Sequence, residues 1–574
     1  MDFKESLSKE LATIIGKEIS TIKDLLEKPK HEQFGDYAFP CFSLAKEFRK
    51  SPVQIAQELE NTWKQEEDLA KRFSAKAQGP YLNFTIPTES LVKELLPPFL
   101  DSEGLVAEDS DKETILVESP GPNTNKPLHL GHLRNMLLGS TLKNVLQAKG
   151  HDAKIVNVVN DRGIHISKSM LAYQKWGQGK TPESEGVKPD HFVGQFYVKF
   201  AQEAAKSDDA KEQLETEAQE MLRKWEQGDE DVMKLWKLMN SWVYAGFKKT
   251  YDKLDFRIVK DYFESDTYKG GRDLILQGLE KGVFEQDESG AVLFDPEDEK
   301  LGKKVMLRSD GTTVYITQDV DMARLRYDDF SFDRMIYVVA NEQEHHFKVL
   351  FEAFKALEFP FADKCHHFAY GMVELPSGKM KSREGTVIDT DDLIEEMESL
   401  ARREVEKRYD DLDEKEIAWR SEAIALSAIR FFFLKHDPLK NFVFDKEESL
   451  SFEGETGPYV QYTHARICSI TRKSGQTAQG ADLNLLNTFE DKKLVKLISE
   501  FDNVLFDVSK QLKPSSLCHY LIRLCQEFNT YYSQHKIIQD DKSLEKSRLA
   551  LITALKNVLA TGLELLDITA LEKM

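Results

Sequence analysis

The sequence has few cysteines and no long apolar run, and both facts narrow the class of protein. Five cysteines are scattered over 574 residues without a C-x-x-C pair. This pattern argues against a zinc knuckle and for reduced thiols, so we expect a cytoplasmic protein. No apolar run approaches the roughly 18–20 residues of a membrane span. The charged residues 1–19 indicate an amphipathic helix rather than a secretory signal, and we expect no membrane partner.

Positive charge is also in short supply. The chain has 99 acidic residues against 78 lysines and arginines, a net charge of −21. A nucleic-acid-binding protein is expected to carry a basic footprint, so composition alone argues against RNA. Phosphate contacts depend on local patches, however, and net charge governs solubility more than the chemistry of one site. The length predicts three or four domains.

Residues 115–150 predict a strand, a tight loop and a helix. The apolar run 115–117 ends in a Pro/Gly/Asn loop, and the sequence His-Leu-Gly-His at 129–132 then opens a helical pattern. The apolar residues on one face of that helix are Leu130, Leu133, Met136, Leu137 and Leu146. The first turn of a helix offers free N–H donors and a positive dipole end. His129 and His132 can donate hydrogen bonds to a triphosphate there, and Gly131 lets an adenine or ribose approach the backbone. The alternatives are a chance match and two core histidines.

A second motif is the basic, glycine-bounded loop at 377–388. Its centre reads Lys379, Met380, Lys381, Ser382 and Arg383. A basic loop alone is usually a solvated turn. Together with the upstream His-Leu-Gly-His, in this order, it resembles the KMSKS loop of class I aminoacyl-tRNA synthetases. In that family the loop cations neutralise the phosphates as pyrophosphate leaves.

Further motifs resemble one member family of that class, the arginyl-tRNA synthetases. They are ESPGPNTNKPLHLGHLR at 118–134, YITQD at 315–319, VVANEQEHH at 338–346, GETGPYVQYTHAR at 454–466 and the last ten residues. The resemblance runs from about residue 34 to residue 574. It implies ATP-dependent ligation of L-arginine to its cognate tRNA through an arginyl-adenylate, with Mg²⁺ bound to ATP, and we expect a monomer.

The fold implied by this resemblance has three parts. We expect an N-terminal α/β domain over 1–108 that binds the corner of the tRNA. A Rossmann-like α/β catalytic domain with a parallel sheet follows over 109–395. The third part, 396–574, is an all-α bundle that binds the anticodon. The candidate strands of the parallel sheet are 115–117, 155–159 and 335–339, and the candidate helices of the bundle include 417–434, 494–511 and 544–566.

A charged helical insertion lies near 190–255. It carries Trp225, Trp236 and Trp242, which we interpret as helix-packing residues rather than RNA-stacking ones. In the N-terminal domain, Asn83 and Phe84 are weak candidates for contact with the tRNA corner.

The resemblance also implies site residues. Recognition of arginine needs carboxylates that pair with a planar guanidinium, and an aromatic wall adds a cation–π contribution. The predicted arginine-binding residues are Glu118, Asn123, His129, Tyr315, Asp319 and Gln343. The predicted ATP-binding residues are His129, Gly131, His132, Lys379 and Met380. The predicted catalytic residues are Lys126, His129, His132, Lys379, Lys381 and Arg383. The predicted tRNA-binding residues are Tyr459, Tyr462, Arg466, Tyr532 and Met574; the tyrosines could equally be half-buried bundle packing. We predict no protein-held metal.

The sequence departs from the family pattern at two places. Ser382 replaces the second lysine of KMSKS, and Lys126, just before the histidine motif, supplies the missing charge. The segment 160–165 stands where many relatives have Gly-Asp-Trp-Gly, and we transfer no role to Asp161 or His165. The run 341–346 resembles an inverted zinc-protease motif but lacks its first histidine, and Cys365-His366-His367 has no second ligand pair.

Two alternatives remain at this stage. One is another enzyme on the same nucleotide-binding scaffold, either a class I synthetase for a different amino acid or an HxGH nucleotidyltransferase. The other is a catalytically silent, synthetase-like protein with an RNA-binding or regulatory role.

Overall fold

The computed structural model describes residues 3–29, 31–101, 105–374, 388–409 and 411–574. The chain forms two compact units, each built from separate stretches. Unit 1 consists of Met1–Leu105, Arg466–Phe501 and Arg523–Leu559; unit 2 consists of Val106–Ala465, Asp502–Ile522 and Ala560–Met574. Within the described ranges, no helix is long and apolar enough to cross a bilayer. The domain boundaries at 108 and 395 stay a prediction.

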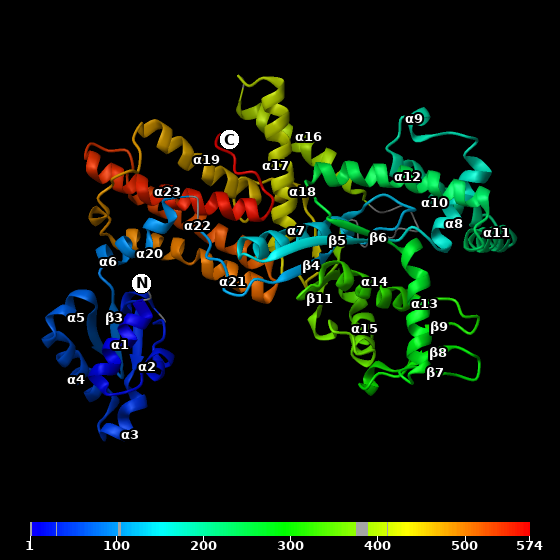
Figure 1. The fold of residues 1–574 in the computed structure, drawn as a ribbon. Coiled ribbons are helices and arrows are strands. Elements are labelled where there is room, and N and C mark those ends of the chain that lie inside the picture. Colours follow the sequence, from blue (N-terminus) through cyan, green and yellow to red (C-terminus); the bar gives the residue numbers. More distant parts are fainter. Residues whose placement is uncertain (1–2, 30, 102–104, 375–387, 410) are drawn as a thin grey trace. The chain divides into compact units, whose positions relative to one another are not determined.

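Unit 2 is built on a five-stranded parallel sheet in the order β11-β10-β4-β5-β6 (Figure 1). The strands are β4 (Thr114–Glu118), β5 (Asp152–Val159), β6 (Lys260–Phe263), β10 (Arg334–Ala340) and β11 (Cys365–Tyr370). Chain order reverses between β4 and β10, which is the switch point where open α/β sheets bind ligands beyond their carboxyl ends. The predicted α/β catalytic fold is confirmed, including all three candidate strands.

Several helices of unit 2 accompany this sheet. They are α7 (Leu130–Ala148), α8 (Ile164–Trp176), α13 (Glu264–Glu280), α14 (Tyr315–Phe330), α15 (Glu344–Ala356), α16 (Thr390–Arg408) and α17 (Glu414–Lys435). The five apolar residues predicted for one face of α7 are all buried. A small antiparallel sheet of β7 (Glu285–Gln286), β8 (Val292–Phe294) and β9 (Lys304–Leu307) precedes α14 and packs into the core around β10.

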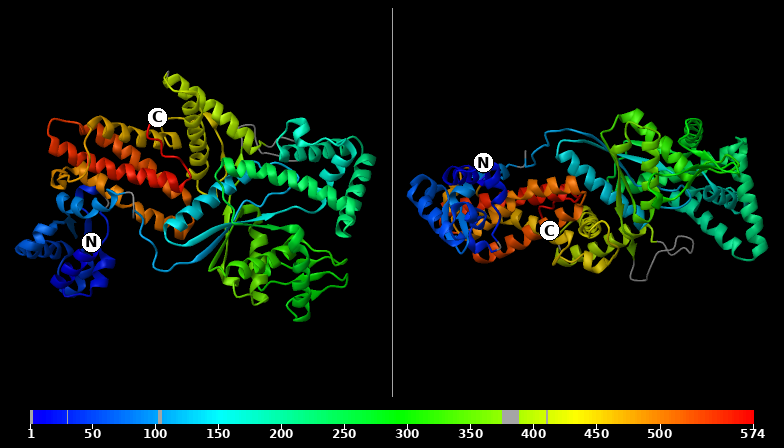
Figure 2. Two further views of the ribbon diagram at one scale, coloured as in Figure 1. Left: turned by 45° about the horizontal axis from the view of Figure 1, so that its top comes forward. Right: turned by 90° about the horizontal axis from the view of Figure 1, so that it is seen from below.

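The insertion consists of α10 (Pro189–Ala204), α11 (Asp208–Glu226) and α12 (Glu230–Lys253), which lie beside α8 (Figures 1 and 2). Its tryptophans pack as predicted. The Trp225 and Trp236 rings meet at 5.6 Å, and Trp242 contacts Tyr173 and Phe192. Trp236 also donates its indole N–H to the carbonyl of Asp161 (2.6 Å).

Unit 1 combines the first 105 residues with two later stretches of the chain. Its N-terminal part has an antiparallel sheet of β1 (Tyr37–Pro40), β3 (Tyr81–Thr85) and β2 (Ser74–Gln78), covered by α1 (Phe3–Ile15), α2 (Ile19–Leu25) and α4 (Pro52–Gln65). The short helix α6 (Thr88–Leu95) packs on α20 (Phe489–Ser499). The buried ammonium of Lys492 donates to the carboxylate of Asp36 (2.7 Å) and the carbonyl of Ile86 (2.6 Å). This buried contact fastens the first hundred residues to a helix near the C-terminus.

The remaining helices of the C-terminal region are α19 (Gly457–Ser474), α21 (Phe501–Gln511), α22 (Pro514–Gln534) and α23 (Lys542–Leu565). The all-helical prediction is confirmed here. The single helix predicted over 494–511 is wrong, because α20 ends at Ser499 and α21 starts at Phe501. Apolar spacing continues across the break, since Ile498, Phe501 and Leu505 are all fully buried.

Candidate active site

The carboxyl ends of four neighbouring strands bring the candidate residues together. β4 ends at Glu118 and leads to the histidine motif, β10 leads to Gln343, β5 leads to Asn160, and β6 leads directly to Glu264. Because the strands are parallel, all of these residues lie at one edge of the sheet. The predicted ligand site therefore falls at the switch point.

The two motif histidines are held by backbone donors. His129 is the N-cap of α7, and its Nδ1 accepts a hydrogen bond from the N–H of Gly131 (3.1 Å). The Nδ1 of His132 accepts from the N–H of His129 (3.2 Å). The rings stack with centroids 3.9 Å apart. Since both Nδ1 atoms accept, the proton of each neutral ring belongs on Nε2, which is then a donor for a ligand.

Both imidazoles are neutral at physiological pH. Burial and the neighbouring Lys126 ammonium lower the pKa of His129 to about 3. Burial, together with His129 and Lys126, holds the pKa of His132 well below its usual value. The pair therefore offers hydrogen-bond donors without adding positive charge before an anion arrives.

Glycine is required between the two histidines. A Cβ atom at Gly131 would lie 3.0 Å from Cε1 and 3.1 Å from Nδ1 of the His129 ring. Gly131 was predicted to let a nucleotide approach the backbone, and the His129 ring of the protein itself already lies against this position. A side chain here would push the His129 ring out of its hydrogen bond to the helix start.

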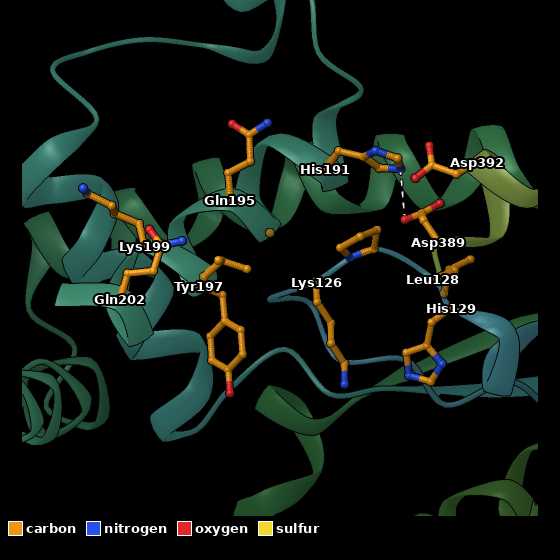
Figure 3. Close-up of a pocket in the computed structure, with 13 residues that line it drawn as sticks. Lys126, Leu128, His129, His191, Gln195, Tyr197, Lys199, Gln202, Asp389 and Asp392 are labelled. Carbon is orange, nitrogen blue, oxygen red and sulfur yellow. Dashed lines mark ion pairs between the residues drawn. The ribbon is translucent and has the colours of Figure 1, made fainter. Parts of the chain in front are cut away.

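Lys126 lines a cavity of about 490 Å³ next to the motif. Loop 126–129 forms one wall, α10 the opposite wall, and Asp389 and Asp392 complete the lining. Figure 3 shows the side chains of Lys126, His129 and Tyr197 pointing in the same direction. Burial lowers the pKa of Lys126. A partly desolvated ammonium beside two neutral donors suits a polyanion.

An acidic pocket lies around the first turns of α14. Tyr315 and Asp319 project from the same face, one turn apart, and the Tyr315 side chain is 71% exposed. The Asp319 Oδ2 lies 2.7 Å from Nε2 of His346 on α15. This contact fixes the orientation of the carboxylate. The sequence alone gives His346 no role toward Asp319, because nothing in it places α15 against α14.

Glu118 already has a partner inside the protein. Its carboxylate forms an ion pair with Arg326, whose side chain is 1% exposed. The guanidinium of Arg326 lies between the rings of Tyr262 (5.2 Å) and Tyr337 (5.8 Å). Burial raises the pKa of Glu118, although Arg326 opposes that shift. The charge of Glu118 is thus balanced before any substrate binds.

Glu264 is a further acid of the pocket that sequence reasoning missed. It opens α13, is 6% exposed and hydrogen-bonds the side chain of Gln318. Burial raises its pKa to about 7, and the negative charges of Asp161 and Asp319 add to the shift. The available signal was its position, directly after an apolar-ended strand and at a helix start.

The Asp161 side chain fixes the start of α13. Its carboxylate accepts from the backbone N–H of Ser265 (2.9 Å), the hydroxyl of Ser265 (2.8 Å) and the hydroxyl of Tyr244 (3.2 Å). Asp161 therefore orients the residue next to Glu264, which is a structural role. His165 contacts the Tyr197 hydroxyl (3.2 Å).

The remaining predicted pocket residues are polar and open to solvent. Asn123 lies beside Asn160 in an isolated parallel bridge, and its neighbour Thr124 donates to the Asn160 carbonyl (3.1 Å). Gln343 ends the short 3-10 helix that leads into α15, and it is exposed. Lys379, Met380, Lys381, Ser382 and Arg383 lie outside the described residues.

The predicted tRNA-binding residues fall in the C-terminal helices. Arg466 of α19 hydrogen-bonds Asn529 (3.2 Å), and its guanidinium lies 4.5 Å from the centroid of the Tyr532 ring. Tyr462 is 39% exposed. Tyr459 lies one turn earlier on α19, and Met574 is the last residue. In the N-terminal part Phe84 is fully buried against Trp63, which disfavours its predicted contact with the tRNA corner.

The cysteine and histidine run at 365–367 packs partly into the sheet. It lies on β11, where His367 contacts the carbonyl of Val339 (3.0 Å) and stacks on Phe347 at 4.4 Å. One group in the described ranges has the spacing of a metal site: Asp190, His191 and Asp391. The Lys188 ammonium lies among these groups, 3.0 Å from Asp190 and 2.6 Å from Asp391. The cation there is supplied by the chain.

Three family models match the chain, and together they span most of it. Residues 96–446 match tRNA synthetases class I (R), catalytic domain; residues 460–574 match the DALR anticodon binding domain; residues 1–86 match the arginyl tRNA synthetase N terminal domain. The chain is 44% identical to an arginine–tRNA ligase of Treponema denticola, over 96% of this chain and 94% of that protein. It is 40% identical to an arginine–tRNA ligase of Parabacteroides distasonis, over 98% and 97%. The solved structure of the Thermus thermophilus arginyl-tRNA synthetase superposes with a TM-score of 0.79 at 28% identity and covers 100% of both chains.

Proposed function

The chain belongs to the arginyl-tRNA synthetase family, and on that premise we propose that it joins L-arginine to tRNA in two steps. The observation that carries this proposal is the pairing of a phosphate-type helix start with an acidic pocket at one sheet edge. In the first step an oxygen of the arginine carboxylate attacks the α-phosphorus of ATP. The new O–P bond replaces the bond to pyrophosphate, which leaves with the electron pair.

We propose that His129 and His132 bind the phosphates of ATP through Nε2–H. Both rings are neutral and fixed by backbone hydrogen bonds, so the donors need no reorganisation when charge shifts toward pyrophosphate. Gly131 keeps the helix start open to the nucleotide. Lys126 supplies a nearby cation, and Lys379, Met380, Lys381 and Arg383 of the second motif complete the site by the family resemblance.

We propose that Asp319 and Glu264 neutralise the guanidinium of arginine. Two carboxylates, one of them buried with a pKa near 7, form a site for a planar cation that donates two parallel hydrogen bonds. Tyr315 forms a wall against the planar guanidinium. Asn123, Gln343 and His129 contact the amino and carboxylate groups of the arginine substrate. Glu118 lines the pocket, with its charge balanced by Arg326.

Mg²⁺ accompanies ATP in this proposal. A hard divalent cation prefers oxygen ligands and is commonly held through substrate phosphates with few protein ligands. The pocket carboxylates are suited to the guanidinium, and two members of the one metal-like group within the described ranges already pair with the Lys188 ammonium, so both observations favour a phosphate-bound ion. When bound, Mg²⁺ neutralises phosphate charge.

In the second step a ribose hydroxyl at the tRNA 3′ end attacks the activated carbonyl, and AMP leaves. We propose that Tyr459, Tyr462, Arg466, Tyr532 and Met574 contact the anticodon region, where exposed tyrosines suit splayed bases. The five cysteines form no disulfide, which fits a reducing cytoplasm, and we propose that the enzyme is a monomer there.

The test is ATP–pyrophosphate exchange with each of the twenty amino acids, with and without tRNA. Exchange with arginine alone among them supports the proposal. Exchange with another amino acid assigns a different specificity, and no exchange under any condition supports the catalytically silent alternative.

A further inference from the structure

A charged cluster beside the histidine motif has no part in the reaction described above. It joins three elements: the start of α10, the last turn of α12 and the start of α16. Its members are Lys188, Asp190, His191, Thr250, Asp389 and Asp391. All of them belong to unit 2.

Lys188 lies at the centre of the cluster. Its ammonium donates to Asp391 Oδ2 (2.6 Å), to the hydroxyl of Thr250 (2.7 Å) and to Asp190 Oδ2 (3.0 Å). The Thr250 hydroxyl also donates to Asp391 Oδ1 (3.0 Å). One ammonium thus links α10 and α12 to the first turn of α16.

His191 makes a second link. Its Nε2 lies 3.2 Å from Asp389 Oδ2 and 3.3 Å from Asp391 Oδ2. Figure 3 marks the contact with Asp389. Burial opposes a charge on the ring, but the hydrogen bonds to both aspartates raise its pKa to about 10. Burial likewise opposes the Asp391 charge, and the hydrogen bonds from His191 and Lys188 lower its pKa to about 2. The links are ionic at neutral pH.

The backbone of the same segment pairs with the histidine motif. Asp389 forms an isolated antiparallel bridge with His129, and the N–H of Thr390 donates to the carbonyl of Leu128 (2.9 Å). The side chain of Asp389 faces His191, while its backbone faces His129. One residue therefore contacts both the insertion and the ATP-binding loop.

The helix that carries His191 also touches that loop directly. A Cβ atom at Gly194 would lie 2.7 Å from Cδ of Pro127, so α10 approaches the loop as closely as a glycine allows. Gly246 of α12 is similarly close to Asp190 (2.2 Å for a Cβ). The insertion, the aspartate segment and the motif loop therefore pack against one another and are held together by ion pairs.

We propose that Lys188 and His191 are positioning residues for arginine activation, which fasten the Asp389–Asp391 segment so that His129 faces the phosphates of ATP. This proposal rests on the proposed function. It assigns the helical insertion a part in setting the geometry of the ATP site. Displacement of a reacting group by about 1 Å can lower a rate about a hundredfold, so loose fastening should lower the activation rate.

The experiment compares His191→Ala and Lys188→Met with Lys168→Ala in the full-length protein. Lys168 is the matched control: its ammonium pairs with Glu215 (2.6 Å) within the same insertion region, and its side chain is 16% exposed, close to the 17% of Lys188. Pyrophosphate exchange gives kcat and the KM values for arginine and ATP. Hydrogen exchange of the Thr390 amide reports the backbone contact. Thermal unfolding shows which variants fold, and His191→Gln is scored if the alanine variant does not.

Both cluster variants should lower kcat of activation about tenfold or more, change the arginine KM less than about twofold, and speed exchange of the Thr390 amide. Lys168→Ala should match the parent in all three. Parental kcat and parental amide exchange in the cluster variants would overturn the proposal, as would an equal loss in the control. If the parent itself shows no arginine-dependent exchange, the proposed function fails, and the Thr390 amide still tests the fastening because it needs no turnover.

Discussion

Replacement of Asp319 by asparagine is the sharpest test of the acidic pocket. Asparagine keeps the size of the side chain and can still contact His346, but it removes the negative charge that faces the substrate. Removal of one partner from a hydrogen-bonded charge pair in an interface costs about 2–5 kcal/mol. Because the Asp319 side chain is 35% exposed, screening favours the lower end, and we expect about 2–3 kcal/mol. That is about a 30- to 150-fold loss in kcat/KM for arginine.

The assay is pyrophosphate exchange with varied arginine, together with competition by citrulline, the neutral isostere of arginine. The variant should raise the arginine KM, leave the ATP KM nearly unchanged and weaken discrimination against citrulline. Asp328→Asn is the control. It removes a carboxylate from the same helix, paired with Arg324 at 2.6 Å, but near the far end of α14. If Asp319→Asn behaves like Asp328→Asn, the carboxylate does not read the guanidinium.

Three further predictions concern the same site. His132→Ala should leave the thermal unfolding midpoint nearly unchanged and raise the activation barrier by about 2–4 kcal/mol, seen as a lower exchange rate at saturating ATP; a parental rate would reduce the motif to a structural role. Lys126→Ala should lower the maximal activation rate more than the affinity for ATP, and adding Ser382→Lys should restore part of the loss in the same assay; an unchanged single mutant would contradict the charge compensation. Burial raises the pKa of Glu264 from 4.5 to about 7, so the arginine KM should fall as pH rises through 7 and Glu264→Gln should remove that dependence. The stability that protonated Glu264 contributes is fully present below pH 4.5 and lost as pH rises through 7. The unfolding free energy of Glu264→Gln minus that of the parent should therefore be larger at pH 8 than at pH 4, and the same value at both pH values would contradict the raised pKa.

Local patterns sufficed to predict the strand, loop and helix that carry the candidate nucleotide site. An apolar run, a Pro/Gly/Asn loop and a histidine N-cap are consecutive in the chain, so β4 and α7 lie where the periodicity places them. The spacing of Tyr315 and Asp319 likewise predicted that the two side chains lie together, because residues four apart on a helix share a face.

The acidic half of the site depends on contacts that local patterns do not encode. The charge of Asp319 acts on Glu264, which follows β6 at the edge of the sheet and opens α13, whose start Asp161 fixes. Arg326 neutralises Glu118 across 208 positions of the chain, and no spacing rule links them. The break between α20 and α21 was missed for a related reason, since buried apolar residues keep helical spacing on both sides of it.

The Lys492–Asp36 contact also bears on how the protein is made. The two residues are 456 positions apart, and Ile86 receives its hydrogen bond from the same lysine. A ribosome that adds about 5–20 residues per second needs roughly 20–90 s to synthesise the chain between them. During that time the N-terminal part has its own sheet but lacks the helix that covers Asp36. Unit 1 is thus begun first but lacks part of its chain until Leu559 has been added, and most of the chain of unit 2 is available for folding before then.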